Sequence, residues 1–139
     1  MILRPSVHWL QACRAMFALN SSLHFYLYRG VTDMRKSFDG LCGIVQSQLG
    51  RDPTSGEVFI FINRRRDRVK LLHWQHGGFV LYYKRLESGT FEFPSSNDHD
   101  NYCQISWQGL VMMIEGISLQ NIKQRKRYSF QQNFHKSPI

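Results

Sequence analysis

Four short apolar segments alternate with clusters of turn-forming residues in the middle of the chain. They are VFIFIN at 58–63, RVKLLHW at 68–74, FVLYYK at 79–84 and TFEF at 90–93. The turns between them are RRRD, QHGG and ESG, and Gly77 and Gly78 can take the positive φ of a tight hairpin. Strands at intervals of about ten residues, separated by such turns, predict an antiparallel meander. A further strand is expected at 24–28 (HFYLY), closed by Gly30.

Between this first strand and the meander, apolar residues recur at the spacing of one helix face. These residues are Met34, Phe38, Leu41, Cys42, Val45 and Leu49. A helix is therefore predicted over residues 33–49, with Thr32 or Asp33 as its N-cap. Gly50 is the expected end, because the following Asp52-Pro53 cannot continue a helix.

The stretch ISWQGLVMMIEGI predicts a second, shorter helix over residues 106–115. Ser106 is its expected N-cap, and Gly116 lies near its end. The predicted fold class is α+β. It consists of an antiparallel meander of four to five strands, one main helix packed on the sheet and a shorter C-terminal helix.

The chain has 139 residues, of which 42% are hydrophobic, which is enough for one folded core. We expect a single α+β domain over residues 24–117, after an N-terminal extension over 1–23 in which Met16 is a possible true start. An alternative for the extension is a structured helix, because four of its residues recur at helical spacing. They are Trp9, Cys13, Met16 and Phe17. Residues 118–139 carry several Lys and Arg and no acid, and are expected to form a basic tail.

The cysteines and the hydropathy pattern restrict the cellular setting. Cys13, Cys42 and Cys103 are odd in number and form no Cys-x-x-Cys pair, which argues against a disulfide framework. No uninterrupted apolar run approaches the roughly 20 residues that span a bilayer. A reduced, cytoplasmic protein is therefore expected.

The chain carries a formal charge of +8, which favours a polyanionic or acidic partner. The strongest concentration of charge is NRRRDRVK at 63–70, on a hairpin turn and the strand that leaves it, and Lys84-Arg85 end the next strand. Arginine binds phosphate through a planar fork and lysine binds it as a point charge. The candidate DNA contacts are Arg64, Arg65, Arg66, Arg68, Lys70, Lys84 and Arg85.

Aromatic residues are interleaved with these cations, as in proteins that contact backbone or unpaired bases. They are Trp74, Phe79, Tyr82 and Tyr83. The alternative is a solvated hairpin whose aromatic residues belong to the core.

Arg35 and Lys36, at the start of the predicted main helix, form a second candidate DNA contact. Both point away from the apolar face of that helix. The alternative is a structural role, because Asp39 lies four residues after Arg35 and could form an intrahelical ion pair with it.

Metal and catalytic motifs are weak. His73-x-x-His76 and His99-x-x-x-Cys103 superficially resemble zinc ligand pairs, but the first pair lies on a strand and turn and the loop between the pairs is too long. Cys42 lies on the apolar helix face, as a buried structural thiol does. We therefore expect no catalytic residues, no metal and no cofactor.

Several ordered motifs suggest a family. They are DMRKSFDGL, an F-x-F pair ahead of a basic turn, RRRDRVKLLHW and G-x-x-L-x-YKRLE-x-G-x-F-x-x-P, with a weaker echo in MMIEGI. Residues 25–94 thereby resemble the TnpB accessory protein of the insertion-sequence-66 family of bacterial transposable elements, which is encoded beside a DDE transposase and is unrelated to the RNA-guided nuclease of the same name. The resemblance implies a protein that assists transposition without itself transferring strands.

The favoured interpretation is a non-enzymatic accessory protein in DNA transposition that binds DNA through a basic hairpin face. Its expected partners are DNA and the transposase of the same element. A second interpretation is a protein that docks on the transposase without recognising DNA directly. A third interpretation is a Mg²⁺-dependent nuclease that uses Asp33, Asp39 and Asp67.

Overall fold

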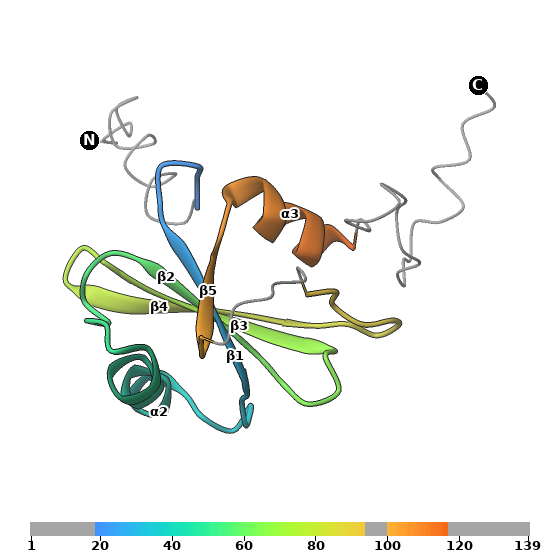
Figure 1. Ribbon diagram of the computed structural model, residues 1–139, viewed down its shortest axis with the longest axis horizontal. Helices are drawn as coiled ribbons and strands as arrows, with labels where there is room; N and C mark the ends of the chain where they lie inside the picture. Colours follow the sequence, from blue (N-terminus) through green and yellow to red (C-terminus); the bar gives the residue numbers. More distant parts are fainter. Residues whose placement is uncertain (1–18, 94–99, 117–139) are drawn as a thin grey trace, which may run out of the picture.

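The computed structural model describes residues 19–93 and 100–116, and the expected N-terminal extension up to residue 18 and the basic tail lie outside this part of the chain. The fold is a five-stranded sheet in the order β4-β3-β2-β1-β5, with helices on both faces (Figure 1). The strands are β1 (Phe25–Val31), β2 (Val58–Ile62), β3 (Arg68–Gln75), β4 (Gly78–Arg85) and β5 (Tyr102–Ile105). The helices are α2 (Phe38–Ile44), which continues as the π-helical turn η1 (Val45–Leu49), and α3 (Trp107–Glu115).

The α+β class and the meander are confirmed, because β2, β3 and β4 pair antiparallel in sequence order. The β3–β4 hairpin closes through His76 and Gly77, both with positive φ, whereas the predicted Gly78 is already part of β4. The first strand departs from the predicted pattern, since β1 pairs parallel with β2, with Phe25 opposite Val58. The helical segment between these strands supplies the crossover that a parallel pair requires.

The fifth strand is not where the sequence suggested. Residues 90–93 form no strand, because Phe91 donates its N–H to the carbonyl of Arg66 (2.6 Å) in the β2–β3 turn. Phe91 is thereby held as a buried core residue. The fifth strand is instead β5, which pairs antiparallel with β1 and forms the edge of the sheet opposite β4. Of the predicted polar loop over 94–101, residues 94–99 lie outside the described part.

The main helix begins at Phe38, five positions later than predicted, and its N-cap is Ser37. Asp33 does not cap it. Its carboxylate accepts the N–H of Arg35 (2.9 Å), and its carbonyl accepts the N–H of Lys36 (3.1 Å), so that residues 33–36 form a separate turn. The predicted end is confirmed, because Gly50 closes η1 with a φ of 63°.

The second helix is confirmed at both ends. The Ser106 hydroxyl accepts the N–H of Gly109 (3.0 Å), and Gly116 ends the helix in the left-handed conformation with a φ of 79°. Both features follow the rules by which a serine N-cap and a terminal glycine satisfy unpaired backbone groups.

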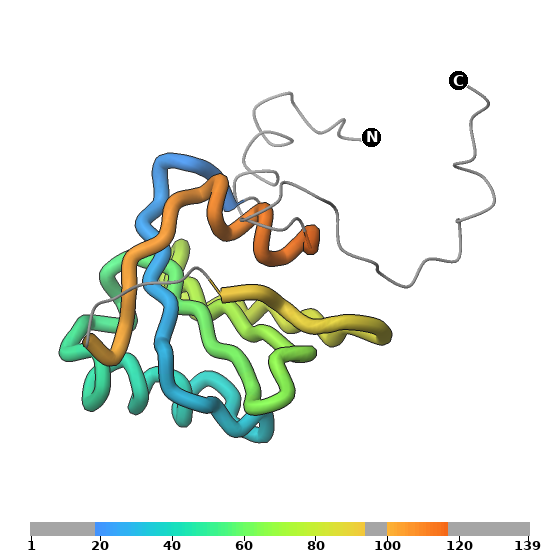
Figure 2. The backbone as a smooth tube through the Cα atoms, turned by 45° about the vertical axis from the view of Figure 1, so that its right-hand side comes forward, coloured from blue at the N-terminus to red at the C-terminus, as the bar shows by residue number. Residues whose placement is uncertain are grey.

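The core has two layers, one on each face of the sheet. Leu110 and Met113 of α3 pack on the face that carries Val58, Ile60 and Ile62. Leu41, Val45 and Leu49 of α2 and η1 pack on the opposite face with Phe59 and Phe61. Figures 1 and 2 show the two helices on opposite sides of the sheet. Because β2 is covered on both faces, its apolar residues run without interruption. In the part of the chain described, no helix is long and apolar enough to span a bilayer.

Candidate nucleic-acid interface

The side chain of Asn63 holds the turn between β2 and β3. Its Oδ1 accepts the backbone N–H groups of Asp67 and Arg68, both at 3.1 Å, and its Nδ2 donates to the Asp67 carboxylate at 2.7 Å. Arg66 completes the turn with a φ of 58°. Arg64, Arg65 and Arg66 are all exposed on this turn. Since Asn63 fixes the backbone, three adjacent arginines are displayed on a rigid loop.

A polar groove separates this turn from the loop that follows β1, with a cavity volume of about 570 Å³. The loop is tied to the end of β2 by the N–H of Thr32, which donates to the carbonyl of Ile62 (3.0 Å). The residues that line this basic groove are Val31, Thr32, Asp33, Met34, Asn63, Arg64, Arg65, Asp67 and Arg68. The structure thus gathers three of the predicted cations, Arg64, Arg65 and Arg68, around one concave surface.

Lys70 lies beneath the same loop and is 5% exposed. Its Nζ donates to the carbonyl oxygens of Met34 (2.8 Å) and Lys36 (2.7 Å). A buried ammonium needs such partners, since an unpaired one pays a large desolvation penalty. Lys70 therefore anchors the loop that carries Arg35 and Lys36, and its ammonium is committed to main-chain oxygens.

Tyr83 is the aromatic residue that accompanies the cations. It lies opposite Lys70 in the β3–β4 register, and Arg68 lies opposite Arg85. Residues that face each other across two strands share one side of the sheet. The Tyr83 hydroxyl accepts from Nη1 of Arg68 (3.2 Å), and its ring centre is 4.6 Å from Nζ of Lys70.

The other aromatic residues that are interleaved with the cations in the sequence do not lie beside them as Tyr83 does. Trp74 and Phe79 pack edge to face at 4.8 Å, and both are partly buried. Tyr82 points to the opposite face of the sheet, where it packs against the core. Burial raises the pKa of its phenol. The alternative, in which the interleaved aromatic residues belong to the core, therefore holds for only part of this group. Tyr83, which is 49% exposed, is the aromatic residue that lies beside the basic residues.

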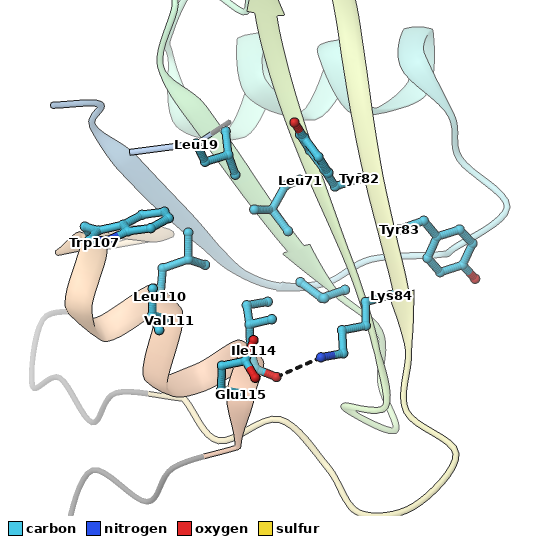
Figure 3. Close-up of a pocket in the computed structure, with 11 residues that line it drawn as sticks. Leu19, Leu71, Tyr82, Tyr83, Lys84, Trp107, Leu110, Val111, Ile114 and Glu115 are labelled. Carbon is cyan, nitrogen blue, oxygen red and sulfur yellow. Dashed lines mark hydrogen bonds between the residues drawn. The ribbon is translucent and has the colours of Figure 1, made fainter. Parts of the chain in front are cut away.

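Lys84 lies on the α3 side of the sheet, away from the basic groove. Its Nζ donates to the carbonyl of Ile114 (3.1 Å) near the end of α3, where a cation also meets the negative end of the helix dipole (Figure 3). Lys84 stands at the rim of a largely apolar cavity of about 310 Å³ between α3 and the β3–β4 pair. Tyr83 also borders this cavity, although in Figure 3 its ring projects from the other side of β4.

Three other predicted cations, Arg35, Arg66 and Arg85, have partners on the surface. Arg35 pairs with Asp33 (2.6 Å) and not with Asp39 as its position on a helix had suggested. Hydrogen bonds from Arg35 lower the pKa of the Asp33 carboxyl to about 2. Arg85 pairs with Glu87 (2.7 Å). Arg66 turns away from the groove, and its Cζ lies 4.6 Å from the centre of the Phe93 ring.

The histidines and cysteines considered for metal binding or catalysis do not line the basic groove in the described part of the chain, whereas Asp33 and Asp67, considered for a nuclease, both do. His73 is buried, with Nε2 3.1 Å from the carbonyl of Gly56, and burial lowers its pKa. Burial also raises the pKa of the Cys42 thiol, which disfavours the nucleophilic thiolate. Across residues 19–93 and 100–116, no group of three or more His, Cys, Asp or Glu side chains could hold a metal ion. His99 lies outside the described part.

Sequence reasoning missed two residues of this site. Asn63 begins the basic stretch, and the signal that could have indicated its role is the preference of Asn for turns, where its side chain bonds nearby backbone groups. Thr32 was considered as a helix cap, whereas its backbone joins the loop to β2. No local signal points to the pairing of Lys70 with carbonyls more than thirty residues away.

The fold and the site define a small basic α+β protein with an arginine-lined groove at one end of its sheet. The chain matches the IS66 Orf2-like protein family over residues 23–124 and belongs to that family. This confirms the resemblance found in the motifs and extends it through α3. The protein is therefore a transposition-associated accessory protein of an insertion sequence.

Two proteins from Sinorhizobium fredii are similar to this chain. The uncharacterized protein y4jC is 32% identical over 93 residues, which cover 67% of this chain and 78% of y4jC. The uncharacterized protein y4hO is 34% identical over 82 residues, which cover 58% of this chain and 70% of y4hO. No solved structure matches the chain.

Proposed function

We propose that the protein is a non-enzymatic accessory factor that binds DNA through the basic groove during transposition. The observation that carries this proposal is the convergence of Arg64, Arg65 and Arg68 on one polar groove beside a fixed turn. Guanidinium groups bind phosphate oxygens in a bidentate manner, and phosphate contacts position a protein on DNA without reading its sequence. In this proposal the protein works in the bacterial cytoplasm, where it meets the DNA of its element.

In this proposal the other residues predicted to contact DNA contribute in different ways. Arg35 and Lys36 flank the groove on the adjacent loop, and Arg66 and Arg85 extend the positive surface around the turn. Lys70 supports the loop from beneath because its ammonium is bound to main-chain oxygens. Lys84, on the opposite side of the sheet, is not part of the proposed surface.

Fluorescence anisotropy with labelled duplex DNA, across a salt series, tests this proposal. Replacing Arg64, Arg65 and Arg68 together with Ala is expected to weaken binding at least tenfold at about 50 mM salt. The plot of log affinity against log salt should become shallower by about 0.9 for each phosphate contact that is lost. Unchanged affinity and slope in a folded triple variant would contradict the assignment.

A matched control separates local contact from net charge. Gln46, Gln48 and Gln108 are exposed and lie on η1 and α3, away from the groove. Changing all three to Glu lowers the net charge by the same amount as the three arginine replacements. If this control weakens DNA binding as much as the triple Ala variant, the binding reflects overall charge and the groove has no special role.

The second candidate function is docking on the transposase. The guanidinium fork that fits phosphate also fits carboxylate, so exposed Arg64 and Arg65 could meet an acidic protein surface. A pull-down with the transposase in nuclease-treated extract distinguishes the two functions. Retention that is lost in the triple Ala variant, together with no affinity for purified DNA, favours docking.

A further inference from the structure

The ring of Tyr83 is constrained on an exposed strand. Nζ of Lys70 lies 4.6 Å from the ring centre, and Nη1 of Arg68 donates to the phenol oxygen at 3.2 Å. The Lys70 ammonium is itself fixed by the carbonyl oxygens of Met34 and Lys36. Two segments of the chain, β3 and the loop before α2, therefore set the position of this one ring, even though 49% of the residue is exposed.

Such a constrained aromatic is unusual for a solvated position. An exposed tyrosine on an edge strand needs no fixed orientation for stability, and β4 is the edge of this sheet. A ring that is held in advance loses little conformational freedom when a flat ligand stacks on it. The ring quadrupole attracts the Lys70 ammonium, and this attraction helps to hold the ring in place.

Tyr83 is continuous with the basic groove through Arg68, which lines the groove and donates to the Tyr83 hydroxyl. A ligand that uses both features must carry a phosphate and an accessible aromatic face. Nucleotides of single-stranded DNA satisfy this requirement, whereas bases inside a duplex are already stacked on their neighbours and hide their faces.

We propose that the basic groove and Tyr83 together bind unpaired DNA, with the phosphate on the groove arginines and a base stacked on Tyr83. This inference rests on the proposed function and narrows it from DNA in general to single-stranded segments. The protein then prefers single-stranded DNA to a duplex of equal length, and Tyr83 supplies the difference.

Two variants of Tyr83 test the stacking. Tyr83→Leu keeps an apolar side chain and removes the ring, and it is expected to weaken binding of a single-stranded oligonucleotide about 5- to 100-fold while leaving duplex binding nearly unchanged. Its salt dependence should match that of the unmodified protein, because no charge is lost. Tyr83→Phe keeps the ring, loses the bond from Arg68 and should retain most of the preference.

A spectroscopic readout detects the stacking directly and complements the affinities of the variants. An oligonucleotide that carries 2-aminopurine should lose fluorescence on binding, since stacking on an aromatic ring quenches this base. Quenching should persist with Tyr83→Phe and disappear with Tyr83→Leu at saturating protein. Thermal unfolding of each variant identifies any loss of structure, and Tyr83→Val then replaces Tyr83→Leu.

The outcomes separate the two proposals. Equal affinity for single-stranded and duplex DNA without quenching, combined with weaker binding by the triple Ala variant, overturns the stacking inference and leaves the proposed function intact. An unmodified protein that binds neither form of DNA overturns both proposals. A single-strand preference that survives in folded Tyr83→Leu also overturns the role given to this ring.

Discussion

Lys70 and Tyr83 face each other across the β3–β4 pair, with the lysine ammonium 4.6 Å from the centre of the tyrosine ring. One of these residues is buried and the other is half exposed. The same ammonium holds two carbonyl groups of the loop before α2. The pair therefore joins the edge of the sheet to the loop that carries Arg35 and Lys36.

Replacing Lys70 with Met should destabilise the protein by about 1–3 kcal/mol. Methionine fills a similar space, but the carbonyl oxygens of Met34 and Lys36 lose their donor in a partly buried setting. Urea unfolding at neutral pH measures the change. An unchanged midpoint and slope would show that these two hydrogen bonds contribute nothing net to stability.

Removing the cap of α3 by Ser106→Ala should cost about 1 kcal/mol, because the N–H of Gly109 loses the hydroxyl that accepts it. Ser106→Asp provides the matched control, since aspartate is an equally good N-cap residue. The free energy of unfolding should fall for the alanine variant and stay close to the original value for aspartate. Equal losses in both variants would point to strain at this position instead of a lost cap.

Stability should decline as the pH falls from about 7 to 5, in part because of His73. Burial lowers the pKa of His73 in the folded protein, whereas an unfolded histidine has a pKa of about 6.5. Below pH 6.5 the unfolded chain therefore binds the proton more readily, and folding loses free energy until the folded pKa is passed. Urea unfolding of the original protein and His73→Phe across this range should show a smaller decline in the variant. Parallel pH profiles would contradict the assignment.

Asp33 should titrate near pH 2, and the cause is testable. Hydrogen bonds from the Arg35 side chain lower the pKa of this carboxyl to about 2. Because the folded pKa is depressed, the contribution to stability is present above the unfolded pKa and is lost as the pH falls from about 4 to 2. NMR titration of the carboxyl carbon measures the pKa directly. Arg35→Gln should raise it toward the ordinary value, and Asp39→Asn should leave it unchanged.

Local signals explain which elements could be predicted from the sequence. The meander follows from turn residues placed between apolar segments, and α3 follows from a serine cap and a terminal glycine. The start of α2 was misplaced because Asp33 and Ser37 are both capping residues, and only the folded chain shows that Asp33 engages Arg35 instead. The parallel pairing of β1 and the existence of β5 depend on contacts between distant segments, which no local pattern encodes.

The sequence indicates which basic and aromatic residues are available for the candidate site, but it indicates less well how the fold arranges them. The alternation of side chains along a strand already places Lys84 on the side opposite Tyr83 and Arg85, and this rule could have divided the predicted cations into two groups. The burial of Lys70 could not be foreseen, because its partners are main-chain oxygens of a loop on another element. Arg64, Arg65 and Arg68 are close together in the sequence, while the groove they share is a product of tertiary structure.

The parallel pairing of β1 with β2 decides where the charges meet. Two parallel strands finish at the same end of a sheet, so the loop after β1 and the turn after β2 are neighbours. Had β1 run the other way, the loop with Arg35 and Lys36 would emerge at the far end of β2, about 17 Å away for a strand of this length. The concave cationic surface is thus assembled by the direction of β1, and substitutions at the β1–β2 pair could disable the surface without touching an arginine of the groove.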